Sequence, residues 1–182
     1  MKFFFKSLAV SLVVSLFAGC SGINNDRDDI TTLIITGNSF ESRALAEHLQ
    51  VRNNQPILAI PGNSNDTALY VMGPGQDKLL KIDQDRFASF IDFTNPKYVL
   101  ILGNNAYVPE SYINQINESN TKFVFNDSDW KLIAWQLEEL TGYSGLAEDY
   151  IETLDELIRS KTVKSQYAPT VPSEPKMVLP NN

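Results

Sequence analysis

The chain has 182 residues, of which 43% are hydrophobic and 20% charged, a composition that fits one globular domain with flanking segments. Its formal net charge of −7 argues against a nucleic-acid-binding protein and against general attraction to an anionic membrane or polymer. The single cysteine excludes a disulfide within the chain.

Residues 1–19 have the three-part layout of an export signal. Lys2 and Lys6 form a charged start, an apolar run covers residues 7–17, and two small residues precede Cys20. The apolar run is too short to span a bilayer as a helix. An ordinary secretory peptide that happens to end in cysteine is the alternative interpretation.

The residues around Cys20 resemble a bacterial lipobox. The resemblance implies cleavage before Cys20, a diacylglycerol on its sulfur, and a third acyl chain, such as palmitate, on its amine. Several acyl chains would anchor the protein stably to a membrane. Ser21 after the cysteine favours the outer membrane of a Gram-negative envelope, facing the periplasm or the surface. In a Gram-positive host the anchor would be the outer face of the plasma membrane.

Beyond the cysteine, residues 20–30 are polar and predict a tether, and residues 31–159 predict a single domain. Apolar runs that end at Gly, Pro or polar residues predict strands at 31–36, 57–60, 68–72, 98–102 and 122–125. Amphipathic runs predict helices at 39–50, 85–93, 109–117, 129–140 and 148–159. Residues 160–182 contain four prolines and no helical periodicity, which predicts a flexible, extended tail.

Terminal residues support several of these helices. Asp127 or Ser128 is expected to cap the helix at 129–140, and Gly142 is expected to end it. Pro109 suits the first turn of its own helix.

The alternation of strands and helices predicts an α/β fold. We expect a three-layer sandwich with a mainly parallel sheet flanked by helices, of Rossmann-like or toprim-like type. Ligands in such folds bind beyond the carboxyl ends of the strands. These ends are rich in Asn, Gly and Ser, which offer hydrogen bonds without strong acids or bases. The candidate ligand-binding residues near them are Asn38, Ser39, Asn63, Asn104, Asn105, Asp127 and Trp130.

Two segments resemble the type 2 cell-wall-binding repeat. Residues 34–60, IITGNSFESRALAEHLQVRNNQPILAI, follow its plan of strand, small-residue turn, Ala- and Leu-rich helix and "PILLV" strand. Residues 95–116, NPKYVLILGNNAYVPESYINQI, follow its "PKKVYIVGG" strand and the next helix. The Asp-Arg pair that the family places near Trp130 is missing, and residues 63–82 have no counterpart. The resemblance implies a compact three-layer α/β fold and non-covalent, non-catalytic adhesion to an anionic wall polymer.

The residues that could act in catalysis are better explained by structural roles. His48, the only histidine, lies nine residues from Ser39 along the predicted helix, about 13 Å, too far for a catalytic dyad. The turn at residues 37–39 lacks the neighbouring motifs of a hydrolase elbow, a phosphate loop or a dinucleotide fold. Asp83 and Asp85 are expected to cap a helix start. We therefore predict no enzyme, no metal and no cofactor.

Trp130 and Trp135 point about 140° apart on one helix, so one is expected in the core and the other at the surface. The acids of the last two helices predict a solvated face or, alternatively, a docking surface for a basic partner. These acids are Glu138, Glu139, Glu148, Asp149, Glu152, Asp155 and Glu156.

Together these features predict a membrane-anchored envelope lipoprotein that binds cell-wall or surface polymer, such as a glycan, without catalysis. The alternative is a protein-interaction subunit of an envelope machine, such as a secretion, pilus or competence apparatus. The expected partners are membrane lipid at Cys20, an envelope polymer or glycan, and envelope proteins. A small hydrolase that uses Ser39 is a third interpretation.

Overall fold

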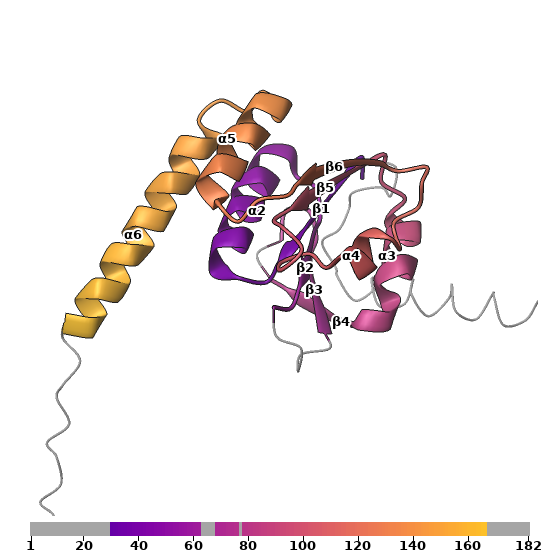
Figure 1. The fold of residues 1–182 in the computed structure, drawn as a ribbon, viewed down its shortest axis with the longest axis horizontal. Helices are drawn as coiled ribbons and strands as arrows, with labels where there is room; N and C mark the ends of the chain where they lie inside the picture. The colour runs from indigo at the N-terminus through magenta and orange to yellow at the C-terminus, as the bar shows by residue number, and fades with distance from the viewer. Residues whose placement is uncertain (1–29, 63–67, 77, 167–182) are drawn as a thin grey trace, which may run out of the picture.

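The computed structural model describes residues 30–62, 68–76 and 78–166, with side chains through residue 160, and contains one six-stranded sheet with helices on both faces (Figure 1). The strands are β1 (Thr32–Gly37), β2 (Ile57–Ile60), β3 (Ala68–Met72), β4 (Leu80–Asp83), β5 (Tyr98–Leu102) and β6 (Thr121–Phe125). The helices are α2 (Phe40–Asn53), η2 (Gln84–Arg86, a 3₁₀ turn), α3 (Phe87–Thr94), α4 (Glu110–Ile113), α5 (Trp130–Thr141) and α6 (Leu146–Gln166). The predicted α/β class is confirmed.

The sheet is mixed but mostly parallel, with the strand order β4-β3-β2-β1-β5-β6. β1 pairs in parallel with β2 and β5, and β5 pairs in parallel with β6. β3 and β4 run antiparallel to their neighbours. Fewer than a dozen residues connect β2 to β3 and β3 to β4, too few for the crossover that a parallel pair needs, so both connections reverse the chain.

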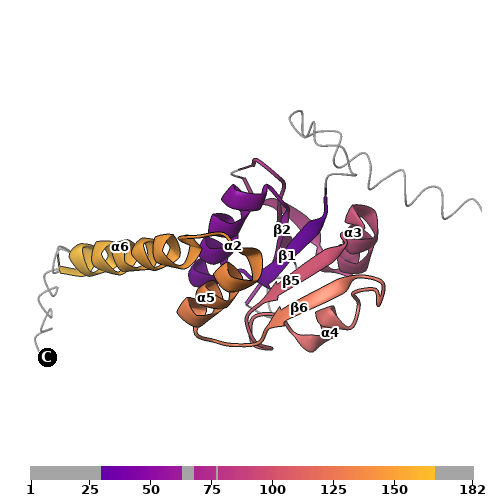
Figure 2. The same ribbon diagram turned by 90° about the horizontal axis from the view of Figure 1, so that it is seen from above.

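The hydrophobic core has two halves, one on each face of the sheet. Successive residues of β1 alternate between them, with Leu33 and Ile35 in one half and Ile34 in the other. Helices α2, α5 and α6 cover the Ile34 side, whereas α3, α4 and the segments next to them cover the other (Figure 2). The result is a three-layer arrangement in which the central strands have no solvent-exposed face.

Helix α2 starts and ends at residues that cap it. Ser39 Oγ accepts a hydrogen bond from the Ser42 amide at 3.2 Å, and Ser42 Oγ accepts one from the Ser39 amide at 3.1 Å. Asn54 ends the helix in the left-handed conformation, with φ of 52°. Ser39, in the tight turn between β1 and α2, therefore has a structural role as the N-cap of α2.

Three helix predictions need correction. The helix expected at 109–117 is only the single turn α4, because the amides of Gln115 and Ile116 bond to carbonyls three residues back. Helix α5 is capped by Asp129, and not by Asp127 or Ser128, since Asp129 Oδ1 accepts from the amides at 131 and 132. Helix α6 continues through Gln166, seven residues past its predicted end.

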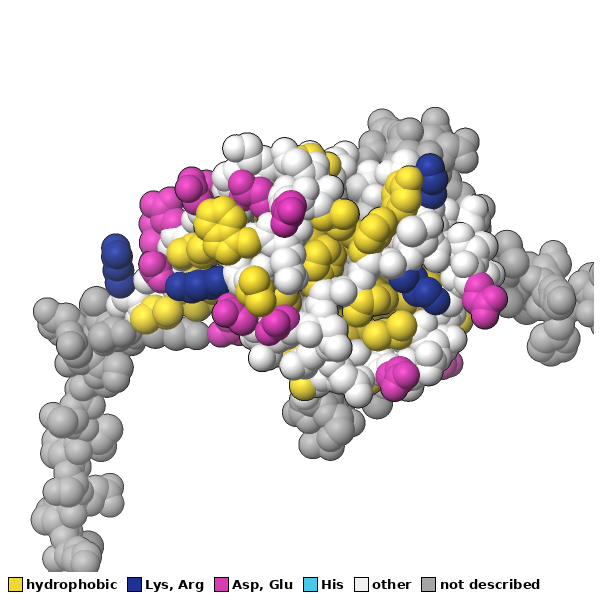
Figure 3. Space-filling model, turned by 45° about the horizontal axis from the view of Figure 1, so that its top comes forward, with side chains coloured by type: hydrophobic (Ala, Val, Ile, Leu, Met, Phe, Trp, Pro, Cys, Tyr) yellow, Lys and Arg dark blue, Asp and Glu magenta, His cyan; other side chains and the backbone are white. Residues whose placement is uncertain are grey.

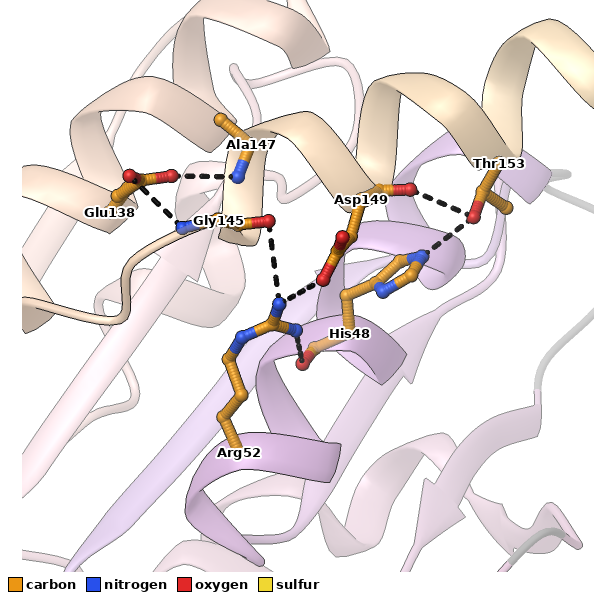
Figure 4. Close-up of polar contacts among 7 residues, drawn as sticks. All are labelled: His48, Arg52, Glu138, Gly145, Ala147, Asp149 and Thr153. Carbon is orange, nitrogen blue, oxygen red and sulfur yellow. Dashed lines mark hydrogen bonds and ion pairs between the residues drawn. The ribbon is translucent and has the colours of Figure 1, made fainter.

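Polar contacts fix helix α6 against α2 and α5 (Figure 4). Arg52 of α2 pairs with Asp149 and donates to the Gly145 carbonyl at 3.4 Å. His48 Nε2 lies 2.8 Å from Thr153 Oγ1. The Glu138 carboxylate accepts from the amides of Gly145 at 3.2 Å and Ala147 at 2.9 Å, which satisfies donors at the start of α6. Among the described residues, no helix is long and apolar enough to cross a membrane.

Replacing Glu138 with alanine is expected to destabilise the protein by about 1 kcal/mol, because two amides at the start of α6 lose their acceptor. Glu139→Ala is the matched control. Glu139 is the next residue on α5 and is exposed, so its loss should change the free energy of unfolding by less than about 0.5 kcal/mol. Urea denaturation followed by circular dichroism measures both. Equal losses in the two variants would contradict the capping role of Glu138.

Candidate functional site

The strand order creates a switch point between β1 and β5. From β1 the chain crosses one face of the sheet through α2 to reach β2, and from β5 it crosses the other face through α4 to reach β6. The loops after β1 and β5 therefore diverge, at the position where α/β proteins bind ligands. Asn38 and Ser39 follow β1, and Asn104 and Asn105 follow β5, so two of the predicted clusters meet here.

Two aromatic side chains fill this crevice. A Cβ atom on Gly37 would lie 3.0 Å from Tyr107 Cδ1, and one on Gly103 would lie 2.9 Å from Tyr107 Cβ and 3.0 Å from the Trp130 ring. The rings of Tyr107 and Trp130 meet edge to face, with centroids 4.9 Å apart. The switch point is thus closed by the protein's own side chains.

Polar atoms near the closed crevice are buried without hydrogen bonds. Asn38 Oδ1 and Trp130 Nε1 have no partner in the part of the chain that the structure describes. Next to them, the Tyr150 hydroxyl donates to the Glu41 carbonyl at 3.2 Å. Burial, followed by the charges of Glu41 and Asp129 and by the Tyr107 hydroxyl, raises the pKa of Tyr150 far above its ordinary value. None of these groups is tuned as an acid or base near neutral pH.

An open pocket of about 370 Å³ lies beside the crevice, at the carboxyl ends of β5 and β6. Four asparagines line it, together with Gly103, Glu110 and the apolar side chains of Val108, Ile113 and Val124. The four asparagines are Asn104, Asn105, Asn114 and Asn126, and we call this hollow the asparagine pocket. Of the predicted ligand-binding residues, Asn104 and Asn105 line this pocket, whereas Asn38 does not.

Two of the pocket asparagines also shape the loop that holds them. Asn104 Oδ1 accepts from the Ala106 amide at 3.0 Å, and Asn105 Oδ1 accepts from the Glu110 amide at 2.7 Å. Their Nδ2 groups donate to no other described residue. Asn114 and Asn126 make no side-chain hydrogen bond within the described ranges. The pocket thus presents amide donors throughout, and amide acceptors on its α4 and β6 sides.

The other predicted ligand-binding residues have different surroundings. Ser39 caps α2, and Asp127 Oδ1 accepts from the next two amides at 2.7 and 2.9 Å, so both support local folding. Trp130 is only 6% exposed and faces the core, so its ring offers no outer surface to a ligand. Asn63 and Cys20 lie outside the described residues.

The groups weighed for catalysis are dispersed. His48 faces Thr153 of α6, and burial, reinforced by the neighbouring Arg52, lowers the pKa of its imidazole. Within residues 30–62, 68–76 and 78–166, no group of three or more His, Cys, Asp or Glu side chains is placed to hold a metal ion.

A larger open hollow of about 680 Å³ borders η2 and α4 and includes Asp83 and Asp85. The prediction that these acids cap a helix start is confirmed in position for Asp83 and is wrong for Asp85. Asp83 stands at the cap position of η2 without a side-chain capping bond and lies 4.0 Å from Arg86 Nε, and Asp85 is exposed in the first turn. The hollow also contains Tyr112, and burial raises the pKa of its hydroxyl.

Several site residues were missed at the level of sequence. Tyr107 carries no local signal, because its position depends on two glycines from distant strands. Asn114 lies in a segment predicted as a longer helix, and the structure places it at the C-terminal end of α4, away in sequence from the strand ends that guided the prediction. Asn126 follows β6 directly, so the strand-end rule could have included it.

Comparisons of the chain with protein-family models, with curated proteins and with solved structures find no match.

The closed crevice makes Gly103→Ala strongly destabilising, by about 2–4 kcal/mol. Gly103 has φ of 103°, and its added Cβ would meet Tyr107 and Trp130. Gly142→Ala is the control, since Gly142 also has positive φ but has open space around it, and should cost about 1 kcal/mol. Thermal or urea unfolding measures both.

A second variant separates the packing contribution from the backbone contribution. In Gly103→Ala with Tyr107→Gly, the combined loss should be smaller than the sum of the single losses, because Tyr107→Gly removes the Cβ and Cγ atoms that the new methyl group would meet. Strictly additive losses would show that Tyr107 does not pack against Gly103.

Proposed function

We propose that this chain is a non-catalytic binding module for a glycan of the bacterial envelope, and that the asparagine pocket holds the sugar. The carrying observation is the convergence of four neutral amides, with apolar side chains between them, at the carboxyl ends of β5 and β6. Sugar hydroxyls both donate and accept hydrogen bonds, and amides match both roles without a charge. The apolar side chains suit the C–H faces of a sugar ring.

The charge of the chain favours a neutral glycan over an anionic polymer. The formal net charge is −7, and Glu110 at the pocket would repel phosphate or carboxylate groups. The resemblance to the type 2 cell-wall-binding repeat supports non-catalytic binding in the envelope, but its implied ligand is anionic, unlike the neutral glycan proposed here. We extend that resemblance to the fold as well, proposing a Rossmann-like or toprim-like lineage for the three-layer sandwich.

Replacing Asn114 and Asn126 together with alanine should weaken binding to isolated peptidoglycan sacculi by about tenfold or more, since each neutral hydrogen bond contributes about 0.5–1.5 kcal/mol. Neither side chain makes a described intramolecular bond, so the fold should be retained. Co-sedimentation of the full-length protein with sacculi, over a range of protein concentrations, gives the affinity. Binding should hardly change from pH 6 to pH 8, because amides do not titrate.

Gln136→Ala is the matched control, because Gln136 is an exposed amide on α5, away from the pocket. It should bind sacculi as tightly as the unmodified protein. Absence of any retention on sacculi and on surface polysaccharide would remove the proposal, and equal retention of all variants would move the binding site away from the pocket.

We also propose that acyl chains on Cys20 anchor the module in the envelope, at the outer membrane of a Gram-negative host. The support is the export signal of residues 1–19, the lipobox-like residues that follow, and the uniqueness of the cysteine. Residues 20–30 then connect the anchor to the start of β1.

Cys20→Ser should shift the protein from the membrane fraction to the soluble or secreted fraction, because it removes the acylated sulfur. Fractionation of cells followed by immunoblotting measures this shift, and metabolic labelling with a palmitate analogue should be lost in parallel. A Cys20→Ser protein that still sediments with membranes would show that the anchor lies elsewhere.

The second candidate function is that of a protein-interaction subunit of an envelope machine. The observation that favours it is the exposure of large apolar side chains on α5 and α6, surrounded by acids.

A further inference from the structure

Helices α5 and α6 expose an apolar surface on the side turned away from the sheet. Trp135 is 47% exposed and Leu132 is 42% exposed, and they lie three residues apart on one face of α5. Ile158 of α6 is 60% exposed. Lys131 and Asp155 form an ion pair at 3.9 Å that joins the two helices between these side chains. We call this surface, defined by Leu132, Trp135 and Ile158, the α5–α6 face.

The α5–α6 face is surrounded by negative charge. Glu139 lies one turn from Trp135, and Glu152 lies one turn from Asp155, so acids flank the apolar side chains. Between residues 130 and 160 the chain has seven acidic and only two basic side chains. Figure 3 shows hydrophobic side chains on α5 and α6, at the left, around a basic group and beside several acidic ones.

Helix α6 extends this surface beyond the domain. Its second half passes the ends of α2 and α5 in both ribbon views (Figures 1 and 2). Most of the stability of a helix in a protein comes from packing of its apolar side, so a projecting helix gains from a partner laid along it. Ile158 of α6 and the apolar side chains of α5 together offer an elongated site.

We propose that the α5–α6 face binds a basic amphipathic helix of a protein partner. Its apolar side chains would cover Leu132, Trp135 and Ile158, and its Lys or Arg side chains would face Glu139 and Glu152. A large aromatic side chain near the centre of such a surface typically carries much of the binding energy. The surrounding acids select a positively charged partner and speed its association.

The same charges disfavour the other occupants. An anionic membrane surface would be repelled by the acids beside the face, such as Glu139 and Glu152. A second copy of this chain would bring the same acids against the first set. A basic amphipathic helix has an elongated shape that fits this surface, and its charge is opposite to that of the surrounding acids.

The test uses the purified full-length protein and three labelled synthetic helices in fluorescence anisotropy titrations. One peptide has Leu on one face and Lys on the other, the second replaces Lys with Glu, and the third keeps Lys but replaces Leu with Ser. The Leu/Lys peptide should bind at least about tenfold more tightly than either of the others, with an affinity that falls as salt rises.

Variants then locate the binding site. Trp135→Ala should weaken the Leu/Lys peptide about 30-fold, and Leu132→Ser about tenfold, while circular dichroism spectra show that both variants remain folded. Glu139→Lys with Glu152→Lys should weaken it similarly. Val51→Ser is the matched control, since Val51 is 85% exposed on α2, and it should leave binding unchanged.

Several outcomes would overturn the proposal. These are failure of the Leu/Lys peptide to bind, equal binding of the Ser/Lys peptide, or equal binding by the Trp135 variant. Analytical ultracentrifugation tests whether a second copy of this chain occupies the face. A dimer of the full-length protein that Trp135→Ala dissociates would assign the face to a second copy of this chain.

Discussion

Burial of β1 on both of its faces is the constraint on which the remaining structure depends. Leu33, Ile34 and Ile35 have no solvent exposure, which requires helices on both sides of the sheet. The helix that follows β1 covers one side, and the turn that follows β5 covers the other. The divergence of these two connections creates the switch point, so the position of the candidate site is a consequence of how the central strand is covered.

Much of the fold was predictable because short apolar runs end at clear breaks. The strands at 57–60, 68–72 and 98–102 agree with the structure to the residue. Hydrophobic periodicity does not show whether neighbouring strands are parallel or antiparallel. The antiparallel pairing of β3 and β4 follows instead from the short connections before each strand. The turns after Asn114 and the extension of α6 to Gln166 depend on local backbone bonding that hydrophobic periodicity does not encode.

The candidate site was predictable in part. Asparagines were expected at the strand ends, and those of the β5–β6 end do line one pocket. Local rules could not reveal that Tyr107 closes the neighbouring crevice, because Gly37 and Gly103 make room for its ring from separate strands. Helical geometry correctly required one buried and one exposed tryptophan. Only the packing of α5 decided that Trp130 is the buried one and Trp135 the exposed one.

The parallel direction of the central strands also orients the protein. The chain enters β1 at Thr32, at the amino-terminal edge of the sheet, whereas the asparagine pocket lies at the opposite, carboxyl-terminal edge. If acyl chains anchor Cys20, as we propose, the entry edge would be the edge connected to the membrane and the pocket would lie at the opposite edge. The length of β1, about 20 Å at 3.3 Å per residue, then separates the lipid side from the ligand side. The direction of the central strands would then place the ligand side of the domain farther from the membrane than the side where the chain enters.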